Sequence, residues 1–223
     1  PSSLMGLSFD ARTPVGTLRV NSRLAGRFNL YNLLAAAATG VGLGLPLSAI
    51  EAGVSAVTAV PGRFQVVSSP EDEVLVIVDY AHTDDALKNL LEAVRPLATA
   101  RMITVFGCGG DRDRTKRSLM GAVAARLSDL VVITSDNPRS EDPEAIIDEI
   151  ERGIAPAAER ARQASGVAAT GRPPAATPWI RLADRRAAIT RAVREASPGD
   201  VVVIAGKGHE KTQVLRDREF PFD

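Results

Sequence analysis

Short apolar runs alternate with segments of mixed polarity from residue 74 onward. The runs are Val74–Val78, Met102–Phe106, Leu130–Thr134, Trp179–Leu182 and Val201–Ala205. Mostly continuous apolar runs of this kind are typical of strands that are buried on both faces of a parallel sheet. The pattern therefore predicts five buried strands in this part of the chain.

The segments between these runs carry apolar residues at helical spacing. Spacings of three and four residues place side chains on one face of a helix, which can then cover a sheet. One set is Leu87, Leu90, Leu91 and Val94, and the next is Leu119, Met120, Val123 and Leu127. Strands and helices in alternation predict an α/β fold with a doubly wound, mostly parallel sheet.

Polar residues mark the expected starts of the helices. Thr83 or Asp84 can open the first, and Asp184 precedes a helical segment at Arg185–Ala196. Side chains of these types accept hydrogen bonds from the free N–H groups of a first turn. The cap positions therefore agree with the phase of the apolar runs.

A further helix is expected after Asp142, since proline at the next position, Pro143, suits a first turn. Gly153 is expected to end this helix, because glycine commonly follows a last helical turn. Ala155–Pro178 is rich in Ala, Arg, Gly and Pro with weak periodicity. We expect a helical start that gives way to a surface loop.

Residues 1–60 differ from the rest of the chain. A mixture of polar and apolar residues around Thr17–Asn21 precedes two Ala- and Leu-rich helical segments, near Asn29–Thr39 and Pro46–Ala59. This part is expected to be the tail of another domain. The boundary is placed at Val60–Gly62, because Pro and Gly together interrupt both helices and strands.

Composition narrows the classes of function. Basic and acidic residues number 27 each, so the formal net charge of zero favours neither nucleic acid nor an anionic membrane as a partner. Cys108 is the single cysteine and no apolar stretch has the length of a membrane span, which fits a reducing cytoplasm. The chain opens at Pro1 without the features of a signal peptide, so we expect it to be cut from a longer protein.

Polar residues follow every predicted strand. In an open parallel sheet, ligands bind beyond the carboxyl ends of the strands. The segments in question are Asp79–Thr83, Gly107–Asp113, Ser135–Arg139, Ala183–Arg185 and Gly206–Glu210, and they include both histidines, His82 and His209. Helix capping alone would explain some of these residues. A ligand site at this edge of the sheet explains the whole set better.

Each of these residues also has a plain structural interpretation. Arg112 and Arg139 could pair on the surface with Asp111, Asp113 or Glu141, which is a nearly neutral arrangement. The glycines at 107, 109 and 110 could form an ordinary turn, although glycine also permits close approach of a ligand to the backbone.

Two further interpretations are weaker. Cys108 as a nucleophile is disfavoured, because neither histidine is beside it in sequence, and a small buried packing residue is the better description. Lys207 suggests a phosphate-binding loop, but Gly208 follows it in place of Ser or Thr. His209 could simply be a loop histidine.

Several motifs, taken in order, resemble those of the Mur ligases of peptidoglycan synthesis. They are Gly26–Asn32, Val60–Phe64, Asp79–Thr83, Gly107–Arg117, Asp136–Pro143 and Ala205–Glu210. The resemblance implies three domains in the whole protein: a nucleotide-sugar-binding domain, a central ATP-binding domain and a Rossmann-like domain for the incoming amino acid. Residues 1–60 would be the end of the central α/β ATP-binding domain and residues 61–223 most of the last domain.

The resemblance also implies residues for ATP. Asn29 and Asn32 would lie on the adenine side and Arg63 near the phosphates. Asp79 and His82 would lie around the ribose. The chemistry is suitable, because amides can satisfy a base edge, a carboxylate accepts from ribose hydroxyls and a guanidinium binds phosphate oxygens.

The amino-acid pocket implied by the resemblance comprises Arg112, Asp136, Asn137, Arg139, Gly206 and Glu210. In this family an Asp-Asn-Pro-Arg sequence in the third loop goes with meso-diaminopimelate, and loops that lack the Arg go with lysine. The two ligands differ by one distal carboxylate, for which Arg139 and Asn137 offer a planar fork and an amide donor. Glu210 and Asp136 would accept from the distal ammonium.

The implied reaction is ATP-dependent amide formation on a UDP-muramoyl dipeptide through an acyl phosphate, with Mg²⁺ neutralising the phosphates. The metal ligands and catalytic residues are expected in upstream domains of the same protein. No catalytic residue is expected in this fragment, which should be inactive alone. The alternative is a non-catalytic module that binds diaminopimelate or a partner protein. One departure from the family pattern is Asp84, which stands where these proteins usually have Pro.

Overall fold

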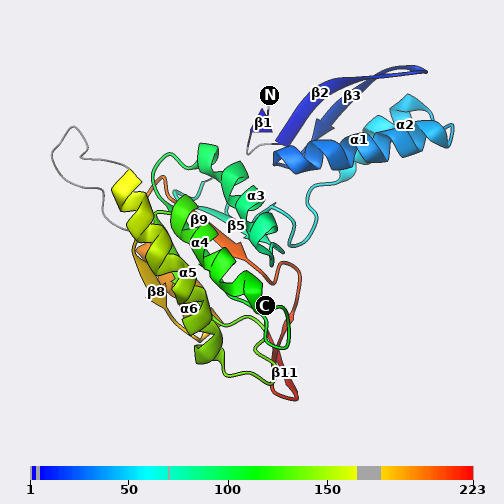
Figure 1. The fold of residues 1–223 in the computed structure, drawn as a ribbon. Coiled ribbons are helices and arrows are strands. Elements are labelled where there is room, and N and C mark those ends of the chain that lie inside the picture. Colours follow the sequence, from blue (N-terminus) through cyan, green and yellow to red (C-terminus); the bar gives the residue numbers. More distant parts are fainter. Residues whose placement is uncertain (1, 4–5, 70, 165–176, 223) are drawn as a thin grey trace. The chain divides into compact units, whose positions relative to one another are not determined.

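The computed structural model describes residues 2–3, 6–69, 71–164 and 177–222. The chain divides into two compact units, Pro1–Phe64 and Gln65–Asp223, and each is described by itself (Figure 1). The division lies close to the expected break at Val60–Gly62. The assignment of the units to parts of two Mur ligase domains stays a prediction.

The first unit is a small sheet with two helices. Its three strands pair antiparallel in the order β1-β2-β3. Their bounds are Ser2–Ser3, Gly6–Thr13 and Gly16–Ser22, followed by α1 (Arg27–Gly42) and α2 (Leu47–Ala56). Leu18 and Val20 of β3 pack with Leu33 of α1 and Ile50 of α2 in one apolar cluster. The two helices were predicted, but the hairpin before them was not.

The second unit contains a six-stranded sheet in the order β4-β5-β9-β6-β7-β8. The bounds are Gln65–Val66 (β4), Leu75–Asp79 (β5), Val201–Ala205 (β9), Met102–Phe106 (β6), Leu130–Ile133 (β7) and Trp179–Arg181 (β8). Only β4 is antiparallel, and the other five strands run parallel. The five strands predicted from the apolar runs and the doubly wound α/β fold are therefore confirmed.

Helices cover both faces of this sheet. They are α3 (Asp84–Val94), α4 (Thr115–Leu127), α5 (Pro143–Ala164) and α6 (Arg185–Glu195), with a short 3-10 turn η1 (Arg95–Leu97) and a hairpin of β10 (Thr212–Leu215) and β11 (Arg218–Pro221). On one face α6 packs Ala188 and Ala192 against alternate residues of β6, β7 and β9. On the other face α4 lies between α3 and α5 (Figure 1).

The predicted helix caps are present. Thr83 Oγ1 accepts a hydrogen bond from Ala86 N at 3.2 Å, so Thr83 opens α3 and Asp84 lies in its first turn. Asp184 Oδ1 accepts from Ala187 N at 2.9 Å at the start of α6. Each cap fixes the point at which a strand-end loop passes into a helix.

The predicted inner face of α4 was partly wrong. Leu119 is 50% exposed and Val123 is only partly buried, whereas the buried residues are Arg117, Met120, Gly121, Ala124 and Ala125. The reason is a close crossing with α5. A Cβ added to Gly121 would lie 2.2 Å from the carbonyl oxygen of Ile150, so the contact face is built from small residues.

The same crossing corrects the expected end of α5. Gly153 does not end the helix, which continues to Ala164. A Cβ on Gly153 would lie 1.8 Å from the carbonyl oxygen of Ser118 on α4, so this glycine permits close helix packing. The helical start expected in Ala155–Pro178 is present. Residues 165–176 of the expected loop lie outside the described residues.

Within the described ranges, no helix combines the length and apolar content that a bilayer crossing requires.

Candidate functional site

The loops that follow β5, β6, β7 and β9 meet in one cavity of about 440 Å³. Because these strands are parallel, their carboxyl ends lie at the same edge of the sheet. The lining residues are Tyr80, His82, Thr83, Gly109, Arg112, Asp113, Lys116, Asp136, Asn137, Arg139, Gly206 and Glu210. All six residues that the family resemblance assigned to an amino-acid pocket are among them. Their role in binding stays a prediction.

Two guanidinium groups line this cavity without a carboxylate partner among the described residues. Arg112 is exposed and forms no ion pair there. Arg139 donates from Nη1 to the carbonyl oxygens of Gly110 (2.8 Å) and Asn137 (3.4 Å). Its Nη2 and Nε have no partner in the described part of the chain. The plain interpretation, in which these arginines pair with nearby acids, is therefore wrong.

The acidic side of the cavity is organised by Lys207, which is 3% exposed. Its Nζ lies 2.9 Å from Asn137 Oδ1, 3.1 Å from Glu210 Oε2 and 3.5 Å from Asp136 Oδ1. Asn137 Nδ2 in turn donates to Glu210 Oε2 at 2.9 Å. The oxygens that the sequence assigned to a ligand ammonium already surround an ammonium group of the chain itself.

Glu210 keeps its negative charge in this setting. Burial acts to raise the pKa of its carboxyl group, but hydrogen bonds from Asn137, Lys207 and Tyr80, with the charge of Lys207, hold it below its usual range. A carboxylate that accepts several hydrogen bonds is favoured in its charged form. Glu210 is therefore an acceptor and not a proton donor at neutral pH.

Sequence reasoning missed this role of Lys207. The available signal was its position directly after the buried strand β9, between two glycines, where a lysine has few ways to reach solvent. Gly206 has φ +114°, and a Cβ there would lie 3.1 Å from Asp136 Oδ2. The glycine allows the chain to turn close to that carboxylate.

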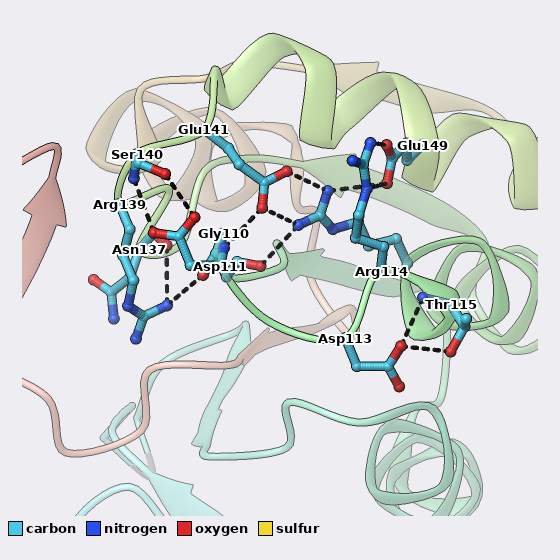
Figure 2. A network of polar contacts seen from close by, with 12 residues as sticks. Gly110, Asp111, Asp113, Arg114, Thr115, Asn137, Arg139, Ser140, Glu141 and Glu149 are labelled. Atoms are coloured by element: carbon cyan, nitrogen blue, oxygen red, sulfur yellow. Dashed lines mark hydrogen bonds and ion pairs between the residues drawn. The ribbon is translucent and has the colours of Figure 1, made fainter.

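The loops after β6 and β7 are joined through their backbones (Figure 2). Gly110 N donates to the Asn137 carbonyl at 2.9 Å, and Arg139 Nη1 returns to the Gly110 carbonyl. A Cβ on Gly110 would lie 1.9 Å from the carbonyl oxygen of Pro138, so only glycine fits at this contact. The approach of the two loops fixes where the Arg139 guanidinium lies.

Acidic side chains add further contacts between the same two loops, and we call this contact region the junction. Asp111 accepts from Ser140 Oγ at 2.6 Å and from Ser140 N at 3.2 Å, and Asp111 N donates to Glu141 Oε1 at 2.7 Å (Figure 2). Asp111 and Arg139 have φ values of +53° and +50°, which are unfavourable for residues with a side chain. The contacts across the junction hold both conformations.

Arg117 of α4 is completely buried and contacts residues of this junction. It binds both carboxylate oxygens of Glu141, at 2.7 and 2.9 Å, and Glu149 Oε2 at 2.9 Å. Its Nη2 also lies 3.3 Å from the Gly109 carbonyl. The hydrogen bonds from Arg117 lower the pKa of Glu141 to about 2. A bidentate pair of this kind adds geometric precision as well as energy.

The residues that the resemblance assigned to ATP fall in both units. In the first unit Asn29 is buried and its Nδ2 donates to the Ala25 carbonyl at 2.6 Å, while Asn32 Nδ2 donates to Asn29 Oδ1 at 3.1 Å. Arg63 is exposed there. The two amides are therefore engaged with each other and the backbone, and the assignment to adenine stays a prediction.

In the second unit Asp79 Oδ1 accepts from Ala81 N at 2.7 Å and so shapes the turn after β5. His82 Nδ1 lies 2.9 Å from the Tyr80 carbonyl oxygen, and its ring borders the cavity. Their assignment to the ribose also stays a prediction.

Two other kinds of chemistry find no support. Cys108 is buried, burial raises the pKa of its thiol to about 12, and its Sγ lies 3.6 Å from Met120 Sδ. It is a packing residue, as expected. The described residues contain no cluster of three or more His, Cys, Asp or Glu side chains that could hold a metal ion.

Comparison with known proteins gives a consistent result. Residues 62–208 match the family model "Mur ligase, glutamate ligase domain". A UDP-N-acetylmuramoyl-L-alanyl-D-glutamate--2,6-diaminopimelate ligase of Gloeobacter violaceus is 52% identical over 211 residues, covering 95% of this chain and 39% of that protein. A ligase of the same name from Geobacter metallireducens is 50% identical over 225 residues, covering 99% of this chain and 42% of that protein. The chain thus spans about two fifths of the length of these relatives.

Solved structures show the same likeness. One UDP-N-acetylmuramoyl-L-alanyl-D-glutamate--2,6-diaminopimelate ligase superposes with a TM-score of 0.64 at 39% identity, covering 100% of this chain and 42% of that chain. A folylpolyglutamate synthase of Mycobacterium tuberculosis, complexed with ADP, reaches a TM-score of 0.66 at 22% identity, covering 92% of this chain and 43% of that chain. The second likeness concerns the fold alone.

Proposed function

Because this chain belongs to the Mur ligase family, we propose that it is the amino-acid-binding part of an ATP-dependent ligase. The ligase would join meso-diaminopimelate to UDP-N-acetylmuramoyl-L-alanyl-D-glutamate in peptidoglycan synthesis. Relatives at 46–52% identity carry names that state UDP-N-acetylmuramoyl-L-alanyl-D-glutamate and 2,6-diaminopimelate. Residues 1–60 would complete the central ATP-binding domain, and residues 61–223 would form most of the last domain.

The observation that carries the proposal is the Arg139 guanidinium in the cavity. It is positioned by backbone carbonyls, through Nη1 only, and its remaining N–H groups have no partner among the described residues. A planar fork of this kind binds a carboxylate through paired hydrogen bonds. Arg112 lines the same cavity and adds a second cation. Together they suit a ligand with an additional carboxylate.

This arrangement would discriminate between diaminopimelate and lysine. Lysine lacks the distal carboxylate, so Arg139 would be left without a partner when lysine fills the cavity. A site built to bind a charged group rejects a ligand that lacks it, because its own polar groups then stay unpaired. Discrimination would arise from this cost as much as from attraction to diaminopimelate.

In the reaction, this part of the protein would contribute by positioning the amino acid and not by chemical catalysis. The cavity would hold diaminopimelate so that a free amine faces the activated carboxyl group of the D-glutamate, and it would limit access of water to that group. ATP, when bound, supplies the phosphoryl group that activates this carboxyl as an acyl phosphate. Asn29, Asn32, Arg63, Asp79 and His82 are assigned to ATP on the family resemblance. No described residue is assigned to Mg²⁺, since the described part offers no ligand cluster.

Calorimetric titration of the chain with meso-diaminopimelate and with L-lysine tests the proposal. Arg139→Ala is expected to reduce the preference for diaminopimelate over lysine by about 2 to 4 kcal/mol, because it weakens diaminopimelate binding and removes the cost that an unpaired Arg139 imposes on lysine. Arg126→Ala is the matched control, because Arg126 is an exposed residue of α4 outside the cavity. Equal binding of diaminopimelate by the Arg139→Ala variant and the parent chain would dismiss the assignment.

The alternative is a module that binds diaminopimelate or a partner protein without turnover. A phosphate-release assay with diaminopimelate and the muramoyl dipeptide distinguishes the two. The chain alone is expected to release no phosphate, and the same residues joined to the first domain and the rest of the central domain are expected to release it. Silence of the joined protein would favour the binding module. The cytoplasmic location inferred from the single cysteine stays a prediction.

A further inference from the structure

Lys207 is a charged residue in an almost fully buried position. Its side chain is 4% exposed and lies against Asp136, Asn137 and Glu210. Burying an ammonium group is costly unless it is paired and hydrogen-bonded. Two carboxylates and an amide oxygen meet this need, so the Lys207 ammonium is paired and held in place.

The contacts of Lys207 join two loops of the cavity, and Glu210 links them to a third. Asp136 and Asn137 follow β7, and Glu210 lies three residues beyond Lys207 in the loop after β9. Tyr80, from the loop after β5, adds a hydrogen bond to Glu210. A shift of the Lys207 ammonium would therefore move acceptors that line the cavity on two sides. This gives Lys207 a positioning role.

The charge of Lys207 also determines the sign of the net charge around the cavity. The lining includes three basic side chains, Arg112, Lys116 and Arg139, and three acidic ones, Asp113, Asp136 and Glu210. Those two sets offset each other, so the buried ammonium of Lys207 leaves a positive excess. The guanidinium of Arg185, completely buried next to Gly206, adds to the same sign.

We propose that Lys207 is a specificity-determining positioning residue: its buried ammonium occupies the acceptors Asp136, Asn137 and Glu210, leaves the cavity with a positive excess, and so biases the cavity toward amino acids with two carboxylates. This rests on the proposed function. At neutral pH lysine carries a net positive charge and diaminopimelate is neutral overall. A positive excess therefore opposes lysine more than diaminopimelate, in addition to the effect of Arg139.

The test is the ratio of the dissociation constants for L-lysine and meso-diaminopimelate, measured by calorimetry on the 223-residue chain. Lys207→Met keeps the length of the side chain and removes its charge. The ratio is expected to fall by about tenfold or more in this variant, because the positive charge that repels the net cation lysine, but not the neutral diaminopimelate, is removed. A merely structural loss would weaken both ligands alike and leave the ratio unchanged.

Glu210→Gln is the second variant, and it changes the charge in the opposite direction. It leaves Lys207 less well compensated, so the ratio is expected to rise. If Lys207→Met does not fold, as judged by circular dichroism, Glu210→Gln decides alone, and a ratio that does not rise overturns the inference. A parent chain that binds neither amino acid contradicts the proposed function itself. A parent that prefers diaminopimelate, with the same ratio in Lys207→Met, contradicts the role of Lys207 alone.

Discussion

At the scale of single residues, the candidate site depends on side chains held in unusual states. Asp111 and Arg139 adopt left-handed backbone conformations, each of which costs on the order of 1 kcal/mol for a residue with a side chain. Arg117 and Lys207 are charged and buried. Such states persist only where neighbouring contacts offset their free-energy cost. Here those contacts join the loops that form the cavity.

The Arg117–Glu141 ion pair should make the stability of the chain depend on pH. Its pKa of about 2 lies below the value near 4.3 that is usual in an unfolded chain. Stability from the Arg117–Glu141 pair is therefore fully present above about pH 5 and lost as the pH falls toward 2. We expect the urea-unfolding free energy to fall over this range, and to fall less steeply in Glu141→Gln. Glu92→Gln, at an exposed position of α3, should retain the parent's slope; equal slopes in all three proteins would contradict the role of Glu141.

At the scale of elements, the crossing of α4 and α5 positions the junction of the two loops. Gly121 and Gly153 allow the helices to approach closely. An ion pair between Arg117 of α4 and Glu149 of α5 also joins them. The helix α4 follows the loop after β6, and α5 follows the loop after β7. A change in the crossing of the two helices should therefore shift the position of Arg139.

Substitution of Gly153 tests the crossing. Gly153→Ala would place a Cβ 1.8 Å from the carbonyl oxygen of Ser118, so the helices must separate. We expect a loss of stability of about 1 to 3 kcal/mol, seen as a lower Tm by circular dichroism. Gly53→Ala in α2 is the control, since an added Cβ there meets nothing within 4 Å and helix propensity favours Ala. A Gly153→Ala chain at least as stable as the parent would show that the helices do not pack this closely.

At the scale of the whole molecule, features that depend on local sequence could be predicted and features that depend on distant contacts could not. The buried strands were evident because continuous apolar runs have few alternatives, and Thr83 and Asp184 marked helix starts through local hydrogen bonds. Gly153 was misjudged because a glycine that ends a helix and one that permits close packing look alike in sequence. Lys207 was missed because two of its three partners, Asp136 and Asn137, lie about 70 residues away.

A crystal structure of the chain grown with meso-diaminopimelate would test the central claim most directly. We predict that the ligand fills the cavity beyond β5, β6, β7 and β9, with its distal carboxylate about 3 Å from the Arg139 guanidinium and Lys207 still bound to Glu210. Diaminopimelate bound elsewhere on the chain, or bound in the cavity with that carboxylate turned away from Arg139, would contradict the account.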